Sequence, residues 1–502
     1  MRQRITFLQK PEDSLDPRAL KITTNAISTP ALKAAREDRL TLGFDELPQE
    51  LYRVLKATRE LHIRWTSVDG YGSIPPFVSR LSPGLHVLYT PLKNSSNSLL
   101  CPTLKKVFGD LDCISPEQSF TNVSVEQLAL PVTTEYHAPL SNLNDLVEYI
   151  THKLCKRKDE EECLSRVSNL QSASSLEIDF DTSSHDLTLT AFWPSRIWNL
   201  NLSKASPEQR LEVGILSVET PNEPEELSLG GFLTVIGEHT KPSPTLFSFP
   251  SRHHSTTQSF SSSFLQPTGL HPTLSLNISS SALPIEDRAC SLHAHLTLPR
   301  AIFADKYQLS DPLFLNSKNL SALRYITSPV DLEAPAYAMS VWGSSLLLEL
   351  SPPTQKSTSG IPWTAQIPLH LRYLLPNTNH SGLAALDVPY PVLFWACTAD
   401  EGTKFSGNPF DRENLGYDGH FGKRTMFYHV APSAGGTGNG GSLINTLDVP
   451  VLDLGKSSWV ETGTAAAVLL GFLWVVWCLV KVLRTEGYGS RRGALVAEKK
   501  KL

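Results

Sequence analysis

Apolar and polar residues alternate with a period of two in short runs along much of the chain, which predicts β-strands. The clearest runs are residues 61–65, 176–181, 292–298, 367–373 and 426–430. Pro, Gly and Asn separate the runs of the C-terminal half, as in an antiparallel β-sandwich. Apolar positions at helical spacing predict two helices, over 45–61 and 143–154. We therefore expect a mainly β protein with a mixed α+β N-terminal region.

The pattern changes along the 502 residues, a length that favours more than one domain. Residues 226–285 are dense in Ser, Thr and Pro and have no sustained period, which is typical of a linker or a long insertion. The predicted parts are an N-terminal α+β domain (1–225), this linker or insertion (226–285), a β-sandwich domain (286–446), a juxtamembrane segment (447–462), a transmembrane helix (463–483) and a basic tail (484–502).

One segment is apolar around its whole circumference. Residues 464–480 carry no charge over seventeen positions. At about 1.5 Å per residue they span about 26 Å, close to the roughly 27 Å of the thin endoplasmic reticulum (ER) bilayer. A buried core helix of this length would keep a polar face. The segment therefore predicts a single membrane span.

Charge is distributed unevenly about this span. From Lys481 onward there are seven Lys/Arg and two Glu, a net of +5; the whole chain is −5, so the preceding residues sum to −10. Basic residues collect on the cytoplasmic side of a span, which predicts a cytosolic tail and a lumenal body. Lys499 and Lys500 stand fourth and third from the end, as in the dilysine retrieval signal of ER membrane proteins. The overall balance does not suggest a nucleic-acid partner.

The body has further features of a lumenal chain. Its six cysteines form an even number, which suits an oxidising compartment, although spacing alone does not fix their pairing. The residues 1–11 hold too short an apolar run for a cleavable signal peptide, so a tail-anchored protein with a cytosolic body is the competing interpretation. Asn-x-Ser glycosylation sequons begin at Asn94, Asn122, Asn201, Asn277, Asn319 and Asn379.

The sequence offers little that resembles a catalytic or metal site. Asp179 and Asp181 form an Asp-x-Asp, but apolar neighbours explain them as the solvent-facing edge of a strand. His293 and His295 share one strand face with no third ligand nearby, so exposed strand histidines are favoured over a metal site. Nucleophile-elbow, zinc-protease and phosphate-loop motifs do not occur. We expect no catalytic residue, no metal and no cofactor.

Six segments of the C-terminal half carry a family resemblance. In order they are LTLPRAIFADKYQL (296–309), DLEAPAYAMSVWGSSLLLEL (331–350), LHLRYLLP (369–376), VPYPVLFWAC (388–397), NPFDRENLGYDGHFG (408–422) and TMFYHVAP (425–432). With a single span behind them, these segments resemble the PIG-X family. Residues 40–65 and 241–255 are similar to its long fungal branch.

The resemblance implies a role without catalysis. PIG-X proteins are ER membrane subunits of glycosylphosphatidylinositol (GPI) mannosyltransferase I, which adds the first mannose to the GPI-anchor precursor. The family member stabilises a multi-span catalytic partner of the PIG-M type, and the fungal branch is also associated with the folding of other ER proteins. Members lack a cleaved signal. An ER cargo receptor or a general lumenal chaperone is the alternative function.

Within this resemblance, Cys290 and Cys397 flank the sandwich segments and are the first choice for a disulfide; the local alternatives are Cys101–Cys113 and Cys155–Cys163. The aromatic patch at residues 394–395 and 408–410 is either core packing or a contact surface for the partner. Small residues four apart (Gly463, Ala467 and Gly471) would allow the span to pack against another helix.

Overall fold

The computed structural model describes residues 2–92, 98–123, 133–155, 160–204, 209–221, 223–286, 288–327, 330–353, 361–378, 382–433 and 441–487. The chain forms two compact units, one of residues 1–373 with 386–447 and one of residues 374–385 with 448–502. The first unit holds two large β-sheets. The second holds the long C-terminal helix.

The helices are α1 Gln49–Lys56, α2 Leu100–Phe108, α3 Pro116–Ser119, α4 Asn144–Lys153, α5 Glu160–Asn169, α6 Pro312–Ser317 and α7 Ser457–Glu486. The strands up to the middle of the chain are β1 Arg2–Gln9, β2 Lys21–Ile22, β3 Ala26–Gly43, β4 Thr58–Thr66, β5 Gly84–Pro91, β6 Thr121–Val123, β7 Thr133–Ala138, β8 Ser175–Asp181, β9 Asp186–Ser203, β10 Arg210–Glu219, β11 Glu226–Val235 and β12 Ser243–Pro250. The later strands are β13 His253–Phe264, β14 Thr273–Ile278, β15 Cys290–Pro299, β16 Ile302–Phe303, β17 Leu320–Ile326, β18 Gly343–Leu350, β19 Trp363–Pro368, β20 His370–Leu371, β21 Leu383–Pro389, β22 Val392–Thr398, β23 Thr425–Pro432 and β24 Ile444–Pro450.

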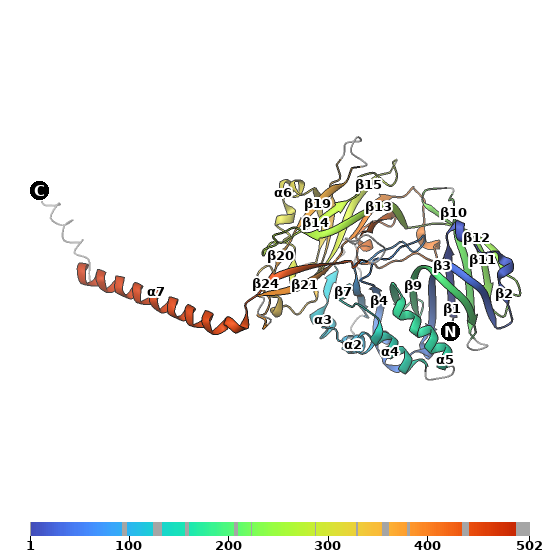
Figure 1. Cartoon of the computed structure of the whole chain (residues 1–502), viewed down its shortest axis with the longest axis horizontal. Helices are drawn as coiled ribbons and strands as arrows, with labels where there is room; N and C mark the ends of the chain where they lie inside the picture. The colour runs from blue at the N-terminus through green and yellow to red at the C-terminus, as the bar shows by residue number, and fades with distance from the viewer. Residues whose placement is uncertain are drawn as a thin grey trace. The chain divides into compact units, whose positions relative to one another are not determined.

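The first sheet has twelve strands in the order β12-β11-β10-β1-β3-β9-β8-β4-β5-β7-β6, with β2 paired to β3. Its strands are antiparallel except at β1 and β10, which pair in parallel from Arg2 with Arg210 to Gln9 with Ser217. Strands far apart in the sequence therefore lie side by side, and Figure 1 shows β1 and β3 close to β10 and β11.

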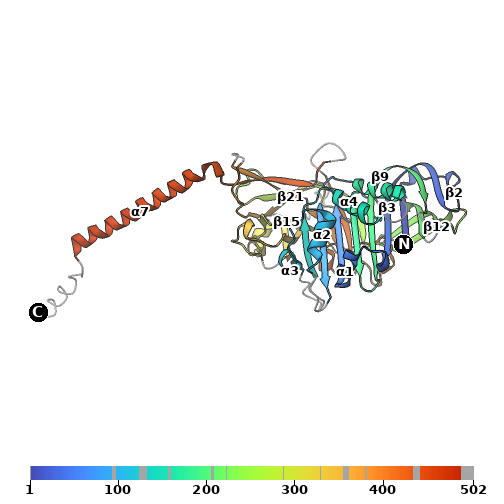
Figure 2. The ribbon, with the colours of Figure 1, turned by 90° about the horizontal axis from the view of Figure 1, so that it is seen from below.

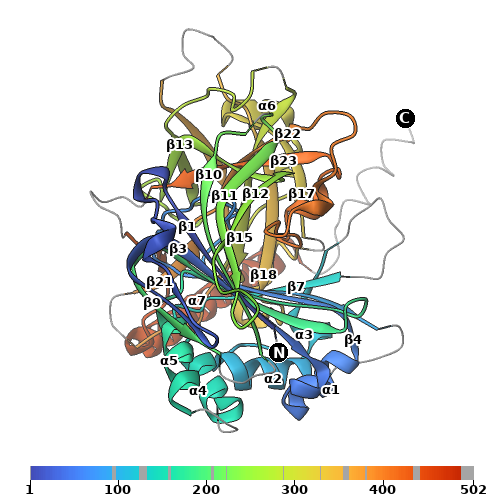
Figure 3. The same ribbon diagram turned by 90° about the vertical axis from the view of Figure 1, so that its right-hand side faces the viewer.

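Helices cover one face of the first sheet. Figures 2 and 3 show α1, α2 and α4 together on one side of its strands, and Figure 3 adds α5 to this group. Apolar side chains such as Val54, Leu104 and Ile150 pack from the helices into one core with Ile63 and Val87 of the strands. The helices remove the apolar face of the sheet from water, which is the main stabilising contribution here.

The second sheet has eight strands in the order β17-β18-β15-β22-β23-β13-β14-β19. All of its neighbours are antiparallel except β13 and β23, which pair in parallel and are separated in the sequence by the whole segment from β14 to β22. Two further pairs, β16–β20 and β21–β24, form small sheets. The prediction of a mainly β fold with a mixed α+β first region and one C-terminal apolar helix is confirmed.

Residues 226–285 differ from the expected linker. They contain β11 and β12, which complete one end of the first sheet, and β13 and β14, which belong to the second sheet. Ser and Thr are compatible with strands when their hydroxyl groups find partners. In β13, for example, Ser262 accepts a hydrogen bond from Asn445 Nδ2 at 3.0 Å. The Ser/Thr/Pro-rich composition therefore gave a wrong prediction for a segment that forms four strands.

Two helix boundaries also differ from the pattern. The helix expected over 45–61 is only α1, because the run from Thr58 onward joins β4, where β-branched and aromatic residues suit a strand. The C-terminal helix is longer than the apolar segment: α7 extends beyond residues 463–483 at both ends. The helix region Leu454–Thr485 is long and apolar enough to cross a membrane.

Candidate functional site at the contact between the two sheets

The connection between β22 and β23 (residues 399–424, here the β22–β23 connection) contacts both sheets. Phe410 packs with Phe77, Phe192 and Phe249 in an apolar cluster on the first sheet, on the face opposite the helices. Tyr417 joins Phe394 and its neighbours in a separate cluster on the second sheet. The segment that carries part of the family resemblance, residues 408–422, is therefore one of the pieces that connect the two sheets.

Charged side chains surround the first of these contacts. We call them the inter-sheet cluster; it consists of Arg4 (β1), Glu37 (β3), Arg64 (β4), Glu177 and Asp179 (both β8), and Arg412 of the connection. Three guanidinium groups face three carboxylates, so the cluster is balanced in charge. Such balance is what allows charges to be buried without a large penalty.

Arg412 is the centre of this cluster. Its Nε lies 2.8 Å from Glu177 Oε1, and its Nη2 lies 3.8 Å from Glu37 Oε2. The guanidinium also donates from Nη1 to Ser79 Oγ at 3.3 Å. Burial raises the pKa of Glu37, while Arg412 and Arg4 oppose that shift. Arg412 thus binds two strands of the first sheet from a loop of the second.

Arginines of the first sheet also donate hydrogen bonds to backbone carbonyls of the connection. Arg39 Nη1 donates to Pro409 O at 3.1 Å, and Arg64 Nη2 donates to Glu413 O at 3.0 Å. These bonds fix the path of the connection as well as its side chains. They require the carbonyls to point at the sheet, so the loop conformation and the sheet register depend on each other.

Asp179 belongs to this cluster and is not a solvent-facing strand edge. It lies 2.6 Å from Arg64 Nη2 and 2.8 Å from His62 Nδ1. Burial tends to raise the pKa of this carboxyl, but the charges and hydrogen bonds of Arg64 and His62 outweigh burial and lower it. The expectation missed that β8 is a central strand, so that His62 and Arg64 of the neighbouring β4 reach Asp179, whose side chain stays 30% exposed. Asp181, at the strand end, accepts the amide hydrogen of Ser183.

The contact with the second sheet is aromatic. Tyr417 is fully buried, lies 4.7 Å from the ring of Phe394, and donates its hydroxyl hydrogen to Arg80 O at 3.1 Å. His293 stacks on Phe394 and meets the edge of Phe421. The expectation that His293 and His295 are exposed was therefore wrong, because rings of the connection cover that face of β15. No group of three or more metal-ligating side chains occurs among the described residues.

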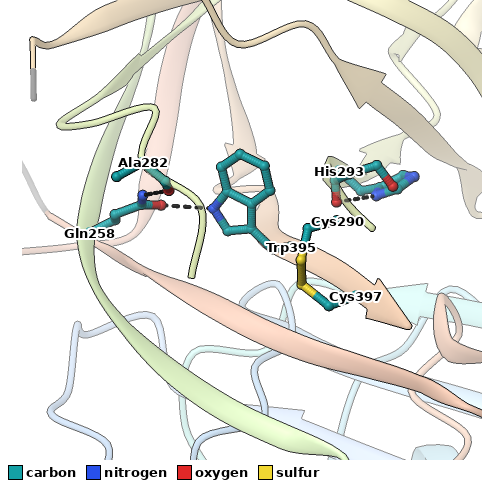
Figure 4. The surroundings of a disulfide bond; sticks show 7 residues. Gln258, Ala282, Cys290, His293, Trp395 and Cys397 are labelled. Atoms are coloured by element: carbon teal, nitrogen blue, oxygen red, sulfur yellow. Dashed lines mark hydrogen bonds between the residues drawn. A yellow bond between two sulfur atoms is a disulfide. The ribbon is translucent and has the colours of Figure 1, made fainter. Parts of the chain in front are cut away.

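The aromatic patch predicted at residues 394–395 and 408–410 is part of this core. Phe394, Trp395 and Phe410 are all buried, so they do not form an exposed contact surface. Trp395 Nε1 donates to Gln258 Oε1 at 2.8 Å, and Gln258 Nε2 donates to Ala282 O at 2.5 Å. Figure 4 shows Trp395 directed toward Gln258, next to the disulfide.

Three disulfides are present in the structure. Cys290 and Cys397 are directly opposite each other on β15 and β22, with Cα atoms 4.1 Å apart, and their bond lies beside Trp395 in Figure 4. The other two bonds join residues that are close in the sequence, in the helical layer of the first sheet. They are Cys101–Cys113 and Cys155–Cys163. The first choice and both local alternatives therefore coexist.

Some of the remaining predicted positions are exposed, and others fall outside the described residues. The sequon asparagines Asn122, Asn201, Asn277 and Asn319 are exposed. Asn94, Asn379, Lys499 and Lys500 lie outside the described residues. Within α7, a Cβ atom added at Gly463 or Gly471 would meet nothing within 4 Å among the described atoms.

Sequence reasoning missed the charged members of the inter-sheet cluster. Glu37 and Arg64 lie at the polar positions of alternating strands, where exposure is the ordinary expectation. Arg412 gives no distinguishing signal, because Asp411 and Glu413 flank it and three successive charges in a turn-rich stretch are ordinarily exposed.

The chain is similar to proteins of one family over almost its whole length. Residues 267–480 match the family model described as PIG-X / PBN1. "Protein pbn1" of Neurospora crassa is 48% identical over 98% of this chain and 97% of its own length. "Protein pbn1" of Emericella nidulans is 44% identical over 97% of both chains, and "Protein PBN1" of Yarrowia lipolytica is 26% identical over the full length of both. The likeness therefore includes both sheets and α7.

Proposed function

The chain belongs to the PIG-X/PBN1 family, which is linked by name to GPI-anchor biosynthesis, and we propose that it is a non-catalytic subunit of ER GPI mannosyltransferase I. In this role it stabilises a multi-span catalytic subunit of the PIG-M type, and the complex adds the first mannose to the GPI-anchor precursor. The observation that carries the proposal is the likeness to pbn1 proteins over almost the whole chain.

The proposed topology places α7 across the ER membrane, the body in the lumen and the basic tail in the cytosol. The charge difference across the span supports this orientation. Three disulfides in the body suit an oxidising compartment. The proposed glycosylation sites Asn122, Asn201, Asn277 and Asn319 are accessible to the lumenal machinery. Lys499 and Lys500 provide the proposed retrieval signal.

The orientation has a direct test. Endoglycosidase treatment of the native full chain should increase its electrophoretic mobility, and substitution of the four exposed asparagines by Gln should remove most of that shift. A chain that keeps its mobility after treatment, and that is digested by protease added outside sealed microsomes, would have a cytosolic body.

The subunit role is tested by depletion. When this chain is depleted, the amount of the multi-span partner should fall, and microsomes should lose transfer of the first mannose from dolichol-phosphate-mannose. Re-expression of the full chain should restore both. A second rescue chain, in which α7 is replaced by an unrelated single span, asks whether the body suffices.

Unchanged partner abundance and unchanged transfer after depletion would refute the proposal. Co-purification distinguishes the alternative function: a single stable multi-span partner supports the subunit, whereas many transient glycoprotein partners indicate a cargo receptor or a general chaperone.

A further inference from the structure

A cleft of about 550 Å³ lies where the end of the first sheet meets the second. It is lined by two arginines (Arg300 and Arg372), by Asp331, by the proposed glycosylation site Asn122, and by apolar side chains that include Ile302, Phe303 and Met339. None of the residues of the inter-sheet cluster lines the cleft, and the proposed stabilising role does not use it. Its combination of guanidinium groups and apolar walls requires an explanation.

Arg372 is the unusual group. It is only 5% exposed, and its Nη1 donates to Ala334 O at 2.8 Å. Its guanidinium carbon lies 4.3 Å from the ring centre of Phe303. Within the described part of the chain Arg372 forms no ion pair, and the nearest charge that acts on it is Asp331 of the same cleft. Burial lowers the pKa of Arg372, and the charge of Asp331 only partly opposes this. A phosphate in the cleft would add a second negative charge beside this largely buried guanidinium.

Arg300 supplies a second guanidinium at the same cleft. Its Nη1 donates to Met339 O at 3.3 Å, and its Nη2 pairs with the carboxylate of Asp112. The side chain of Asp112 is 69% exposed, so this ion pair contributes little and can yield to a ligand. Two planar guanidinium groups match the oxygens of a phosphate, to which arginine donates two parallel hydrogen bonds.

The walls and the rim indicate the remainder of the ligand. Ile302, Phe303 and Met339 offer an apolar surface that an inorganic anion would not need. Next to the cleft, Tyr337 is 59% exposed and Tyr373 is 70% exposed, and Ala336 N donates to Tyr373 O at 3.0 Å. Exposed tyrosines are typical of segments at a membrane–water interface.

We propose that this cleft binds the phosphate group of a membrane phospholipid. Arg372 and Arg300 bind the phosphate oxygens, and the apolar wall contacts the glycerol backbone and the first carbons of the acyl chains. The choice of a membrane lipid rests on the membrane attachment proposed above. It does not rest on the mannosyltransferase role.

Direct binding to the purified full chain, kept soluble in amphipol, tests this inference. The probe is dihexanoyl-phosphatidylglycerol, a soluble lipid with one phosphodiester, and binding is measured by isothermal titration calorimetry. We expect saturable binding at one site, with an affinity at least tenfold lower in Arg372→Gln and several-fold lower in Arg300→Gln. Arg59→Gln, a change at an exposed arginine paired with Glu60, should leave binding unchanged.

Two further measurements keep the test decisive. Arg372→Lys retains the charge at the site if Arg372→Gln fails to fold, and it should keep part of the affinity. Met339→Trp fills the apolar wall without altering charge, so it should weaken lipid binding but not the weak competition by inorganic phosphate.

The inference is overturned by absence of saturable binding, by equal affinity in Arg372→Gln and the parent chain, or by inorganic phosphate binding as tightly as the lipid. Since no transfer of mannose is measured, these outcomes are independent of the depletion experiment.

Discussion

The β22–β23 connection contacts the two sheets through different chemistry. On the first sheet, Arg412 meets Glu37 and Glu177, and arginines bind the backbone of the connection. On the second sheet, Tyr417 and Phe421 pack among aromatic rings. Aromatic burial stabilises with modest demands on geometry, whereas a buried charge tolerates almost no displacement from its partner. One contact therefore supplies stability, and the other fixes the position of the loop.

The covalent links of the two sheets differ as well. In the second sheet, the disulfide Cys290–Cys397 links residues that are 107 positions apart in the sequence. The two disulfides beside the first sheet link residues that are only 12 and 8 positions apart. The following experiments test how much each type of contact contributes.

The largest effect should follow from removal of the long-range disulfide. Replacing Cys290 and Cys397 by Ala should lower the free energy of unfolding by about 4–5 kcal/mol, because the unfolded chain regains the entropy of a long loop. The disulfide Cys101–Cys113 closes a shorter loop. The matched double variant Cys101→Ala with Cys113→Ala should therefore lower the free energy of unfolding by only about 3 kcal/mol. Chemical denaturation of both double variants measures the difference. Equal losses would show that loop length does not control stability here.

Removal of the central charge should come next. Arg412→Ala leaves the buried Glu177 without the guanidinium that pairs with it and removes one of the two arginines that pair with Glu37, which should lower the free energy of unfolding by about 3–5 kcal/mol. Arg59→Ala, at an exposed ion pair, should cost less than about 1 kcal/mol. Thermal unfolding of the full chain compares the two. If Arg412→Ala is as stable as Arg59→Ala, the inter-sheet cluster does not hold the sheets together.

The buried histidines make stability depend on pH. Burial lowers the pKa of His86 and His293 to about 4, and that of His137, His253 and His295 to about 3. Because the unfolded chain binds protons at these positions below its pKa near 6.5 and the folded chain does not, stability falls as the pH drops.

Two buried acids act in the opposite direction. Burial raises the pKa of Glu135 and of Asp411 to about 7, so their protonation favours the folded chain as the pH falls. The histidines outnumber them, since burial lowers the pKa of His254 and His429 as well, and we expect a net loss of stability between pH 6.5 and pH 5.5. Unfolding curves at the two pH values check this, and greater stability at pH 5.5 would contradict it. A His293→Phe variant, which removes one titrating group, should flatten the dependence.

The smallest effect concerns a single hydrogen bond. Tyr417→Phe keeps the ring but removes the donor to Arg80 O, which should lower the free energy of unfolding by about 1 kcal/mol. Tyr417→Ala, which also removes the ring, should cost about 3–5 kcal/mol. The difference between the losses of unfolding free energy in the two variants measures the contribution of the aromatic ring. Equal losses would assign the whole effect to the hydroxyl group.

Local pattern was sufficient for several elements. The alternation at residues 61–65 and 176–181 predicted β4 and β8, and helical spacing predicted α4 almost to its ends. The apolar segment predicted α7, because a helix that is apolar on every side needs no information from the rest of the chain. The even number of body cysteines was compatible with pairing, but alternation could not reveal that Ser/Thr-rich residues 226–285 form strands.

The sequence by itself determined the strand-rich class, the apolar helix and the family resemblance, because these depend on residue type and order along the chain. Tertiary structure decided which polar strand faces are covered. Alternation distinguishes two faces of a strand, but only a distant segment can bury the polar one. The connection of residues 399–424 does so for Glu37 and His293. The partners of Arg412 and the cleft of Arg372 exist only where strands far apart in sequence meet.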